Sequence, residues 1–498
     1  MGKNSTKGIW KVISASSMGT MIEWYDFYIF GSLAVVISTK FFPSDNPTAA
    51  FLSTLATFAA GFVVRPFGAL FFGRLGDIIG RKYTFMATLL LMGGSTFLIG
   101  CIPSYESIGF FAPLLILILR LLQGLALGGE YGGAATYVAE HAPVGQKGYW
   151  TSWIQTTATI GLFISLMVIL ATKNVLSSED FDSWGWRIPF WVSIVMVGIS
   201  YLIRKNMDES PVFAKAKKEG KTSTNPLKES FGNRYNLKFV LLALFGATMG
   251  QGVVWYTGQF YAMSFMKTVM NVDSSQVDEL LGIALLLGTP FFIVFGWLSD
   301  KVGRKYIMMF GMLLAILSYR SIYTEMYNTA DVSYKTEIVE KRSQNIERTK
   351  NNDVITTISK TYTDGTTYIE KKTDFNTKKK SQVNVSININ SEDEWSLIFW
   401  VFIQVLFVTM VYGPIAAFLV EMFPAKIRYT SMSLPYHVGN GIFGGLLPAI
   451  STYFVTHAKA NGKPEFYLDG LWYPIIIASV CFVIGMIYID NKNKTNHL

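Results

Sequence analysis

Long apolar stretches separated by short polar segments run through most of this chain. Twelve stretches approach or exceed the roughly 20 residues that a helix needs to cross a bilayer; they cover about 15–40, 49–72, 83–103, 109–132, 149–172, 187–205, 238–266, 279–298, 306–324, 396–420, 430–456 and 471–490. A polar linker at 206–236 divides them six and six. The pattern predicts an all-α polytopic membrane protein of two six-helix bundles, at 1–205 and 237–498.

One segment in the second half breaks this pattern. From 321 to 394 the chain is polar, with charges of both signs, and it separates the ninth and tenth stretches. Within it, 355–362 and 366–370 flank Asp364-Gly365, a strong hairpin-turn signal, and apolar residues alternate along 383–389. We expect a small external β-rich insert. The segment is also poor in large apolar residues, so a disordered loop is the alternative.

Composition supports a lipid environment and sets the orientation. Hydrophobic residues make up 51% of the 498 residues and charged residues only 15%, which suits a bilayer better than water. The basic residues gather in the linker and in the short loops on the same side, which predicts a cytoplasmic location for these loops and for both termini. The net charge of +9 then reflects topology, and no basic stripe with interleaved aromatics suggests nucleic acid binding.

The chain offers little material for cofactor chemistry. Cys101 and Cys481 are its two cysteines, and both have apolar neighbours, so we expect neither a disulfide framework nor a metal site. Motifs for zinc proteases, serine hydrolases and Walker-type ATPases are absent from the sequence. We therefore expect no cofactor and no enzymatic activity.

A short phrase occurs twice, each time at the end of an apolar stretch. Residues 73–83 read GRLGDIIGRKY and residues 296–306 read GWLSDKVGRKY, so the copies begin 223 residues apart. Internal repetition on this scale indicates two homologous halves, a hallmark of secondary transporters. In each copy the glycines permit close backbone approach, and the aspartate is able to cap a helix or pair with a basic partner.

The repeated phrase resembles the signature loop of the major facilitator superfamily, which joins spans two and three and again spans eight and nine. Further motifs resemble the metabolite:proton symporter family within it: Glu23-Trp24-Tyr25-Asp26-Phe27, Arg65-Pro66-Phe67-Gly68, Arg120-Leu121-Leu122-Gln123-Gly124 with Gly128-Gly129-Glu130-Tyr131-Gly132, and Trp184-Gly185-Trp186-Arg187-Ile188-Pro189-Phe190. The resemblance implies alternating access driven by proton symport, in a bacterial inner membrane. Its members resemble carriers of proline and betaine, 2-oxoglutarate, citrate and shikimate.

The same resemblance assigns a gating role to the repeated loops. In that superfamily the loop aspartate contacts a neighbouring helix in the outward-open state, so Asp77 and Asp300 are the expected latches. Lys301 stands where the first copy has Ile78, so the two latches need not be equally strong. The gating residues implied are Gly73, Asp77, Gly80, Arg81 and Lys82, and Gly296, Asp300, Gly303, Arg304 and Lys305.

Charged residues inside the spans are the candidates for proton coupling. Glu23 and Asp26 share one face of the first span, and Arg65 in the neighbouring span is their natural partner. We expect a cluster facing a cavity, whose carboxylates exchange protons; a static salt bridge that only fixes helix register is the alternative. Arg120 and Glu130 lie ten residues apart on one helix and cannot pair directly, and both are added as separate proton-coupling candidates.

Polar and aromatic residues inside other spans are the candidates for a substrate pathway. They are Tyr25, Arg65, Tyr131, Arg187, Gln251, Trp255, Tyr256, Gln259, His437 and Asn440. Arginine favours carboxylates through bidentate hydrogen bonds, whereas aromatic faces favour a quaternary ammonium. Snorkelling to the membrane interface beside tryptophans is the alternative for Arg187, and helix packing is the alternative for His437.

These observations favour a monomeric, proton-coupled importer of a small carboxylate, such as 2-oxoglutarate or another di- or tricarboxylate. Its partners would be the small-molecule substrate, protons and the lipid bilayer. A proline or betaine symporter is the alternative within the same class, and a nutrient receptor built on a transporter scaffold is the alternative from another class.

Overall fold

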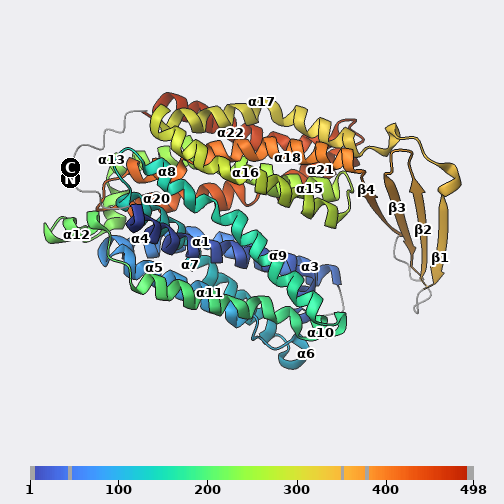
Figure 1. Ribbon diagram of the computed structural model, residues 1–498, viewed down its shortest axis with the longest axis horizontal. Coiled ribbons are helices and arrows are strands. Elements are labelled where there is room, and N and C mark those ends of the chain that lie inside the picture. The colour runs from blue at the N-terminus through green and yellow to red at the C-terminus, as the bar shows by residue number, and fades with distance from the viewer. Residues whose placement is uncertain (1–5, 43–46, 349–352, 376–380, 491–498) are drawn as a thin grey trace.

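The computed structural model describes residues 6–42, 47–348, 353–375 and 381–490. Its helices form two bundles that lie side by side (Figure 1). The N-terminal bundle contains α1 (Thr6–Ser32), α2 (Ala34–Phe41), α3 (Pro47–Val63), α4 (Arg65–Ile78), α5 (Arg81–Ile99), α6 (Tyr105–Ile108), α7 (Phe111–His141), α8 (Lys147–Gln155), α9 (Thr157–Val175), α10 (Ser178–Ser183) and α11 (Ile188–Lys205).

The C-terminal bundle follows the linker, which carries the short helix α12 (Pro211–Lys218). It contains α13 (Arg234–Ala243), α14 (Met249–Tyr256), α15 (Ala262–Thr268), α16 (Ser274–Val302), α17 (Arg304–Ala330), α18 (Ser391–Tyr412), α19 (Ile415–Met422), α20 (Arg428–His437), α21 (Leu447–Ala460) and α22 (Trp472–Tyr488). The π-helical segments η3 (Leu244–Thr248), η4 (Thr257–Tyr261) and η7 (Val438–Gly444) join α13 to α14, α14 to α15 and α20 to α21.

The twelve predicted spans correspond to twelve helical segments, several of them kinked. Ten segments of the described chain are long and apolar enough to cross a membrane. The other two are α1–α2, whose first helix carries four charged residues, and α3–α4, which is interrupted before Pro66. The predicted fold of two six-helix bundles is confirmed. Helix α1 begins at Thr6, earlier than predicted, and Trp10 packs edge-to-face on Trp150 and Trp153 of α8.

The polar insert contains a four-stranded antiparallel sheet in the order β1-β2-β3-β4. Its strands are β1 (Ser343–Arg348), β2 (Val354–Thr361), β3 (Thr367–Asp374) and β4 (Gln382–Asn388). Asp364 and Gly365 form the predicted turn between β2 and β3, and Gly365 has a φ of 89°, which glycine adopts without strain. The predicted start at 321 is wrong, because α17 continues to Ala330 with buried side chains such as Met326.

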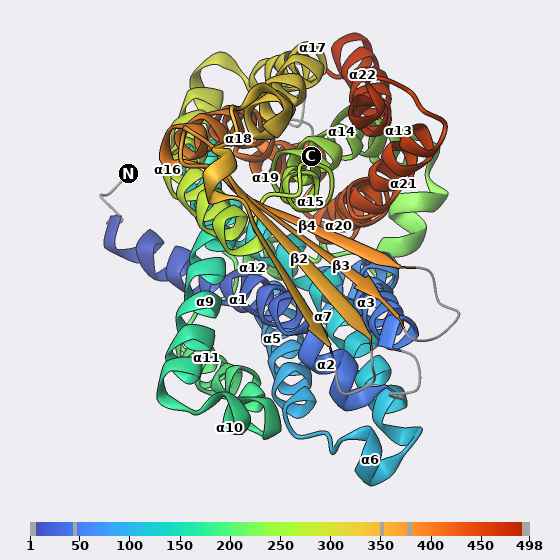
Figure 2. The same ribbon diagram turned by 90° about the vertical axis from the view of Figure 1, so that its right-hand side faces the viewer.

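The sheet is fastened to the C-terminal bundle. Backbone hydrogen bonds join Ile387 of β4 to Asn271 (2.8 Å) and Asp273 (2.9 Å), in the turn between α15 and α16. Gln276 of α16 exchanges two hydrogen bonds with the backbone of Ile389, at 2.9 and 3.0 Å. The sheet projects over α2 and α3 of the N-terminal bundle (Figure 2). We call the end of the bundles that carries the sheet the sheet side. The opposite end, where α12 and the described termini lie, is the termini side (Figure 1).

Candidate functional site

A small cavity lies between the two bundles, about midway along the spans. Its lining is polar and aromatic and comes from both bundles: Glu23, Trp24, Arg65, Trp255, Tyr256, Tyr412, Tyr436, His437, Asn440 and Gly441. Arg65 donates from Nη1 to Glu23 Oε1 at 3.4 Å, and the two side chains are 13% and 8% exposed. A partly buried arginine with a long contact to its carboxylate is suited to bind a second anion.

Arg65 also borders a second small cavity, in which a different ion pair lies. There Arg120 Nη1 donates to Asp26 Oδ2 at 3.0 Å, and Gln123 Nε2 donates to Asp26 Oδ1 at 2.9 Å. The prediction that Arg65 pairs with the carboxylates of the first span holds for Glu23. It is wrong for Asp26, which meets Arg120 because α7 packs beside α1.

Glu130 lies apart from both cavities, in a buried pair with Arg204 of α11. Arg204 Nη2 donates to Glu130 Oε1 at 2.5 Å, and Thr88 Oγ1 donates to Glu130 Oε2 at 2.7 Å. Arg204 also donates to the backbone oxygens of Ala15 and Phe85. Both charged side chains are fully buried, so this network connects α1, α5, α7 and α11 within one bundle.

Several predicted pathway residues meet across the central region. Gln251 and Asn440 exchange two amide hydrogen bonds, at 3.1 and 2.9 Å, which join α14 to η7. Tyr131 of the N-terminal bundle stacks on Tyr436 of the C-terminal bundle, with ring centroids 3.8 Å apart. Trp255, Tyr256 and the pair partner Asn440 line the cavity directly, as does His437.

Tyr131 and Gln251 are not themselves among the lining residues, and three further predicted pathway residues also lie outside the cavity lining. Tyr25 donates to the backbone oxygen of Pro189 at 2.6 Å, inside the N-terminal bundle. Arg187 donates to the backbone oxygens of Gly100 and Ile102 at 2.8 and 2.6 Å, near the sheet side, so it is not brought together with the central group. Gln259 is buried on η4 and is not among the lining residues.

Aromatic side chains close the cavity toward the sheet side. Trp24 of α1 contacts Trp255 of α14, with ring centroids 5.0 Å apart. One turn further along, Phe27 and Tyr28 of α1 contact Phe260 of η4, at 5.1 and 6.4 Å. Because these contacts cross from one bundle to the other, they hold the two bundles together on this side of the cavity.

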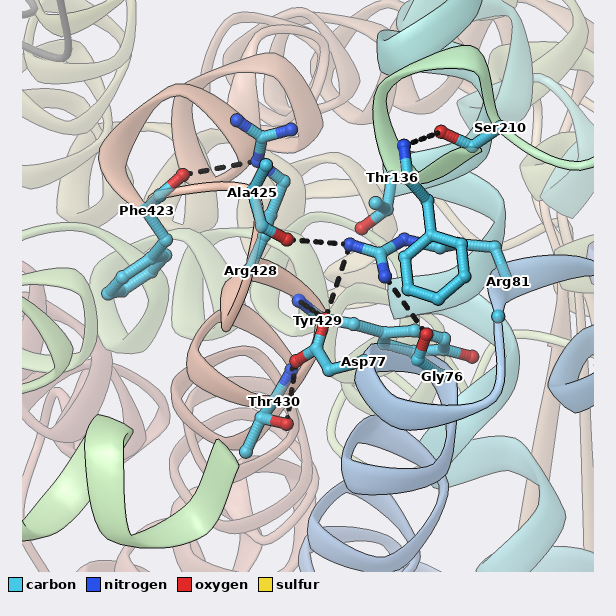
Figure 3. Close-up of polar contacts among 12 residues, drawn as sticks. Gly76, Asp77, Arg81, Thr136, Ser210, Phe423, Ala425, Arg428, Tyr429 and Thr430 are labelled. Carbon is cyan, nitrogen blue, oxygen red and sulfur yellow. Dashed lines mark hydrogen bonds and ion pairs between the residues drawn. The ribbon is translucent and has the colours of Figure 1, made fainter. Parts of the chain in front are cut away.

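The first repeated loop closes the termini side through the backbone of the opposite bundle. Asp77 Oδ2 accepts hydrogen bonds from the backbone nitrogen of Thr430 at 2.9 Å and from its Oγ1 at 2.8 Å, and Oδ1 accepts from the nitrogen of Tyr429 at 3.3 Å (Figure 3). These nitrogens belong to the first turn of α20, where backbone donors have no partner within the helix. Arg81 beside them donates to Ala425 O at 2.7 Å (Figure 3).

The second loop makes the same contact in the reverse direction. Asp300 accepts hydrogen bonds from the backbone nitrogens of Gly148 at 2.9 Å and Tyr149 at 2.8 Å, in the first turn of α8. Each carboxylate therefore caps a helix that belongs to the other bundle, with the helix dipole favouring the negative charge. Arg304 pairs with Asp300 at 2.8 Å, as Arg81 pairs with Asp77 at 3.2 Å.

The remaining residues of the repeat have equivalent places in both halves. Gly80 and Gly303, with φ of 126° and 107°, precede α5 and α17. The lysines hold the loops to the ends of the last spans: Lys82 donates to Lys205 O at 3.0 Å, and Lys305 donates to Ile489 O at 2.7 Å. Gly73 and Gly296 face Thr430 and Ser152 of the opposite bundle so closely that a side chain would not fit.

Two acidic residues that the sequence reasoning missed complete these loops. Glu140, at the end of α7, pairs with Arg428 of the opposite bundle at 2.8 Å, and Arg304 pairs with Glu421, at the end of α19, at 2.6 Å. A repeated signal was available, since Glu140 and Glu421 each stand three residues before a proline and seven before a basic residue. Arg204 had no such signal, because an arginine at the end of a span is also what the positive-inside rule predicts.

Comparison with known proteins agrees with this arrangement. The solved structure of the major facilitator superfamily proton:xylose symporter XylE aligns with a TM-score of 0.70, covering 98% of both chains at 15% identity, which shows the fold. A family model described as "Sugar (and other) transporter" matches residues 11–232. The inner membrane metabolite transport protein YhjE of Escherichia coli is 31% identical over 456 residues, covering 90% of this chain and 88% of that protein. This chain belongs to the metabolite transporters of the major facilitator superfamily.

Two further relatives of this major facilitator protein have names that state a substrate. The alpha-ketoglutarate permease of Escherichia coli is 28% identical over 494 residues, covering 99% of this chain and 96% of that protein. The proline/betaine transporter of the same organism is 34% identical over 310 residues, covering 60% of this chain and 61% of that protein. The chain is thus an integral multi-pass membrane transporter of a small molecule, not an enzyme.

Proposed function

We propose that this transporter is a proton-coupled symporter that imports a small carboxylate, such as 2-oxoglutarate or another di- or tricarboxylate, by alternating access. The observation that carries the proposal is the position of Arg65. It lines the cavity between the bundles and at the same time pairs with Glu23 at 3.4 Å. One cation thus serves both a candidate substrate site and a candidate proton carrier.

The coupling follows from competition for Arg65. A substrate carboxylate that binds the guanidinium in a bidentate manner displaces Glu23, which is 7% exposed. A buried carboxylate without its counter-ion is costly, and a proton on Glu23 removes that cost. Substrate and proton then enter the occluded cavity together. The carboxylates of Asp26, paired with Arg120, and of Glu130, paired with Arg204, are the groups that would accept the proton next, while both arginines stay protonated.

In this proposal the repeated loops control whether the termini side is closed or open. The two cross-bundle caps, from Asp77 to α20 and from Asp300 to α8, hold the termini side closed while the aromatic contacts at the sheet side separate to admit substrate. Release of both caps then opens the termini side. By the proposed orientation that side faces the cytoplasm of a bacterium, across its inner membrane, and each monomer transports on its own.

A zwitterion such as proline or betaine is the second candidate, and one observation favours it. Five aromatic residues line the cavity next to Arg65: Trp24, Trp255, Tyr256, Tyr412 and Tyr436. Aromatic faces attract a quaternary ammonium, while the arginine binds its carboxylate. The relatives named as an alpha-ketoglutarate permease and as a proline/betaine transporter support one candidate each.

Uptake into proteoliposomes tests both the class and the substrate. Purified protein is reconstituted, a pH gradient is imposed, and accumulation of labelled 2-oxoglutarate or glycine betaine is measured. We expect gradient-dependent accumulation of 2-oxoglutarate, lost in Arg65→Lys because lysine offers no bidentate fork. Arg187→Lys, outside the cavity, is the matched control and keeps uptake. Accumulation of betaine alone would select the second candidate, and binding without accumulation would indicate a receptor.

A further inference from the structure

Trp255 carries a buried hydrogen-bond donor that the protein does not use. The residue is 2% exposed and lines the central cavity, and its Nε1 has no hydrogen-bond partner in the described part of the chain. An indole nitrogen is only a donor, and a buried donor left without an acceptor is destabilising because it has lost its hydrogen bond to water. A ligand in the cavity is the group that would relieve this cost.

The Trp255 ring is held in one orientation by its neighbours. Its centroid lies 5.0 Å from the ring of Trp24, 4.8 Å from Tyr256, 5.4 Å from Phe260 and 6.2 Å from Tyr412. These rings come from both bundles and from three separate spans. A donor whose direction is fixed before the ligand arrives loses little entropy on binding, and it discriminates among ligands by position.

Two more polar atoms of the cavity lining are buried without a hydrogen-bond partner among the described residues. They are Arg65 Nε and His437 Nε2. Arg65 is a donor only, like Trp255, and His437 donates or accepts according to its tautomer. Gln251 and Asn440, by contrast, satisfy each other. The cavity lining therefore offers hydrogen-bond donors without partners in the part of the chain that the structure describes, and these donors lie on different spans.

We propose that Trp255, with His437 of the same cavity lining, forms a second polar subsite that binds a further oxygen-bearing group of the substrate while Arg65 binds the first carboxylate. This inference rests on the proposed function and deepens it. A dicarboxylate has acceptors for both donors. The trimethylammonium group of a betaine has none, and it would leave the Trp255 nitrogen unpaired. Trp255 is then the residue that selects dicarboxylates over monocarboxylates and betaines.

The test uses two acids that differ in the second carboxylate. Labelled 2-oxoglutarate is the transported probe, and 2-oxobutyrate, which keeps the 2-oxo acid end, is the competitor, both in proteoliposomes with an imposed pH gradient. Trp255→Phe keeps the ring but removes the nitrogen. We expect the KM for 2-oxoglutarate to rise about tenfold or more, the loss of one hydrogen bond to a charged acceptor, with the inhibition constant of 2-oxobutyrate unchanged.

Trp186→Phe is the matched control, because the Trp186 nitrogen is likewise buried without a partner among the described residues, but Trp186 packs inside the N-terminal bundle, away from the cavity lining. It should not change the ratio between the two acids. His437→Phe, which removes both ring nitrogens, is the second variant, with the same selective rise expected, and it decides the matter if size-exclusion chromatography shows that Trp255→Phe does not fold. Wild-type uptake with equal effects on both acids, or none, in the folded variants overturns the subsite. Absence of wild-type uptake overturns the proposed function instead.

Discussion

Replacing Asp77 with asparagine should shift the transporter toward the state that is open on the termini side. The carboxylate accepts three hydrogen bonds from Tyr429 and Thr430 of the opposite bundle, at 2.8 to 3.3 Å. Asparagine keeps one oxygen, turns an amide donor toward the helix donors, and loses the charge that favours a helix N-terminus.

The expected magnitude follows from these contacts. A hydrogen bond to a charged group contributes about 1.5–3 kcal/mol, and the charge at a helix N-terminus about 0.3–1 kcal/mol. Since asparagine retains part of the first term, we expect a loss of about 1–2 kcal/mol, which is roughly a 5- to 30-fold change in the ratio of open to closed molecules. Asp300→Asn should act in the same direction, and because the two caps are on different helix pairs, the double variant should show the sum, about 2–4 kcal/mol.

Distances between spin labels on the two bundles report this ratio directly. Labels are placed on cysteines introduced at Arg74 and Val302, exposed residues near the termini-side ends of α4 and α16, after Cys101 and Cys481 are replaced. The population at longer distance should grow in Asp77→Asn and grow further in the double variant.

The matched control is Asp273→Asn. Asp273 also caps a helix, through Ser275 at 3.0 Å and Gln276 at 3.3 Å, but donor and acceptor lie in the same bundle. Its substitution removes a cap without releasing a contact between bundles. A distance distribution that is the same in the wild type, in Asp77→Asn and in Asp273→Asn would refute the reasoning.

Three further outcomes are expected. Glu23→Gln should abolish accumulation driven by a pH gradient while counterflow exchange persists; accumulation at the wild-type level would contradict this. Glu130→Gln leaves the guanidinium of Arg204, 1% exposed, without its counter-ion, so thermal unfolding should show a loss of about 3–5 kcal/mol, and an unchanged midpoint would argue against the pair. Partial burial alone would raise the pKa of Asp364, but the hydrogen bond from Lys335 helps to lower it to about 2. The stabilisation of the sheet is then present above about pH 4 and lost as the pH falls through 2, so the wild-type sheet should resist pepsin better than Asp364→Asn at pH 4, and the difference should be much smaller at pH 2.

The sequence predicts those parts of the site that depend on charges in apolar surroundings. Glu23 and Arg65 stand out because a charge inside a span is costly, so pairing between neighbouring spans could be foreseen. The cap partners of Asp77 could not, since the donors are backbone nitrogens of Tyr429 and Thr430, which every residue but proline carries. The pairing of Arg204 with Glu130 could not be predicted, because an arginine at the end of a span is equally typical of a membrane anchor.

The insert shows the same limit for secondary structure. Strands β2, β3 and β4 follow from a hairpin turn and from alternation, which are local signals. Strand β1 has one apolar residue, Ile346, among six, and it forms because β2 offers a free edge to pair with. Strand β1 depends on pairing with β2, and the sequence pattern of β1 alone does not indicate this pairing.

The attachment of the sheet makes it move rigidly with the C-terminal bundle. Hydrogen bonds at Ile387 and Ile389 make the sheet one body with the turn between α15 and α16, so it must follow every rotation of the C-terminal bundle. Strand β1 lies at the far end of the long axis of the molecule, away from the helices (Figure 1). A rotation that moves the helices by the width of a side chain therefore sweeps β1 through a longer arc above the other bundle. A small rotation of the buried helices during transport therefore gives a larger displacement of β1 on the outermost surface of the molecule.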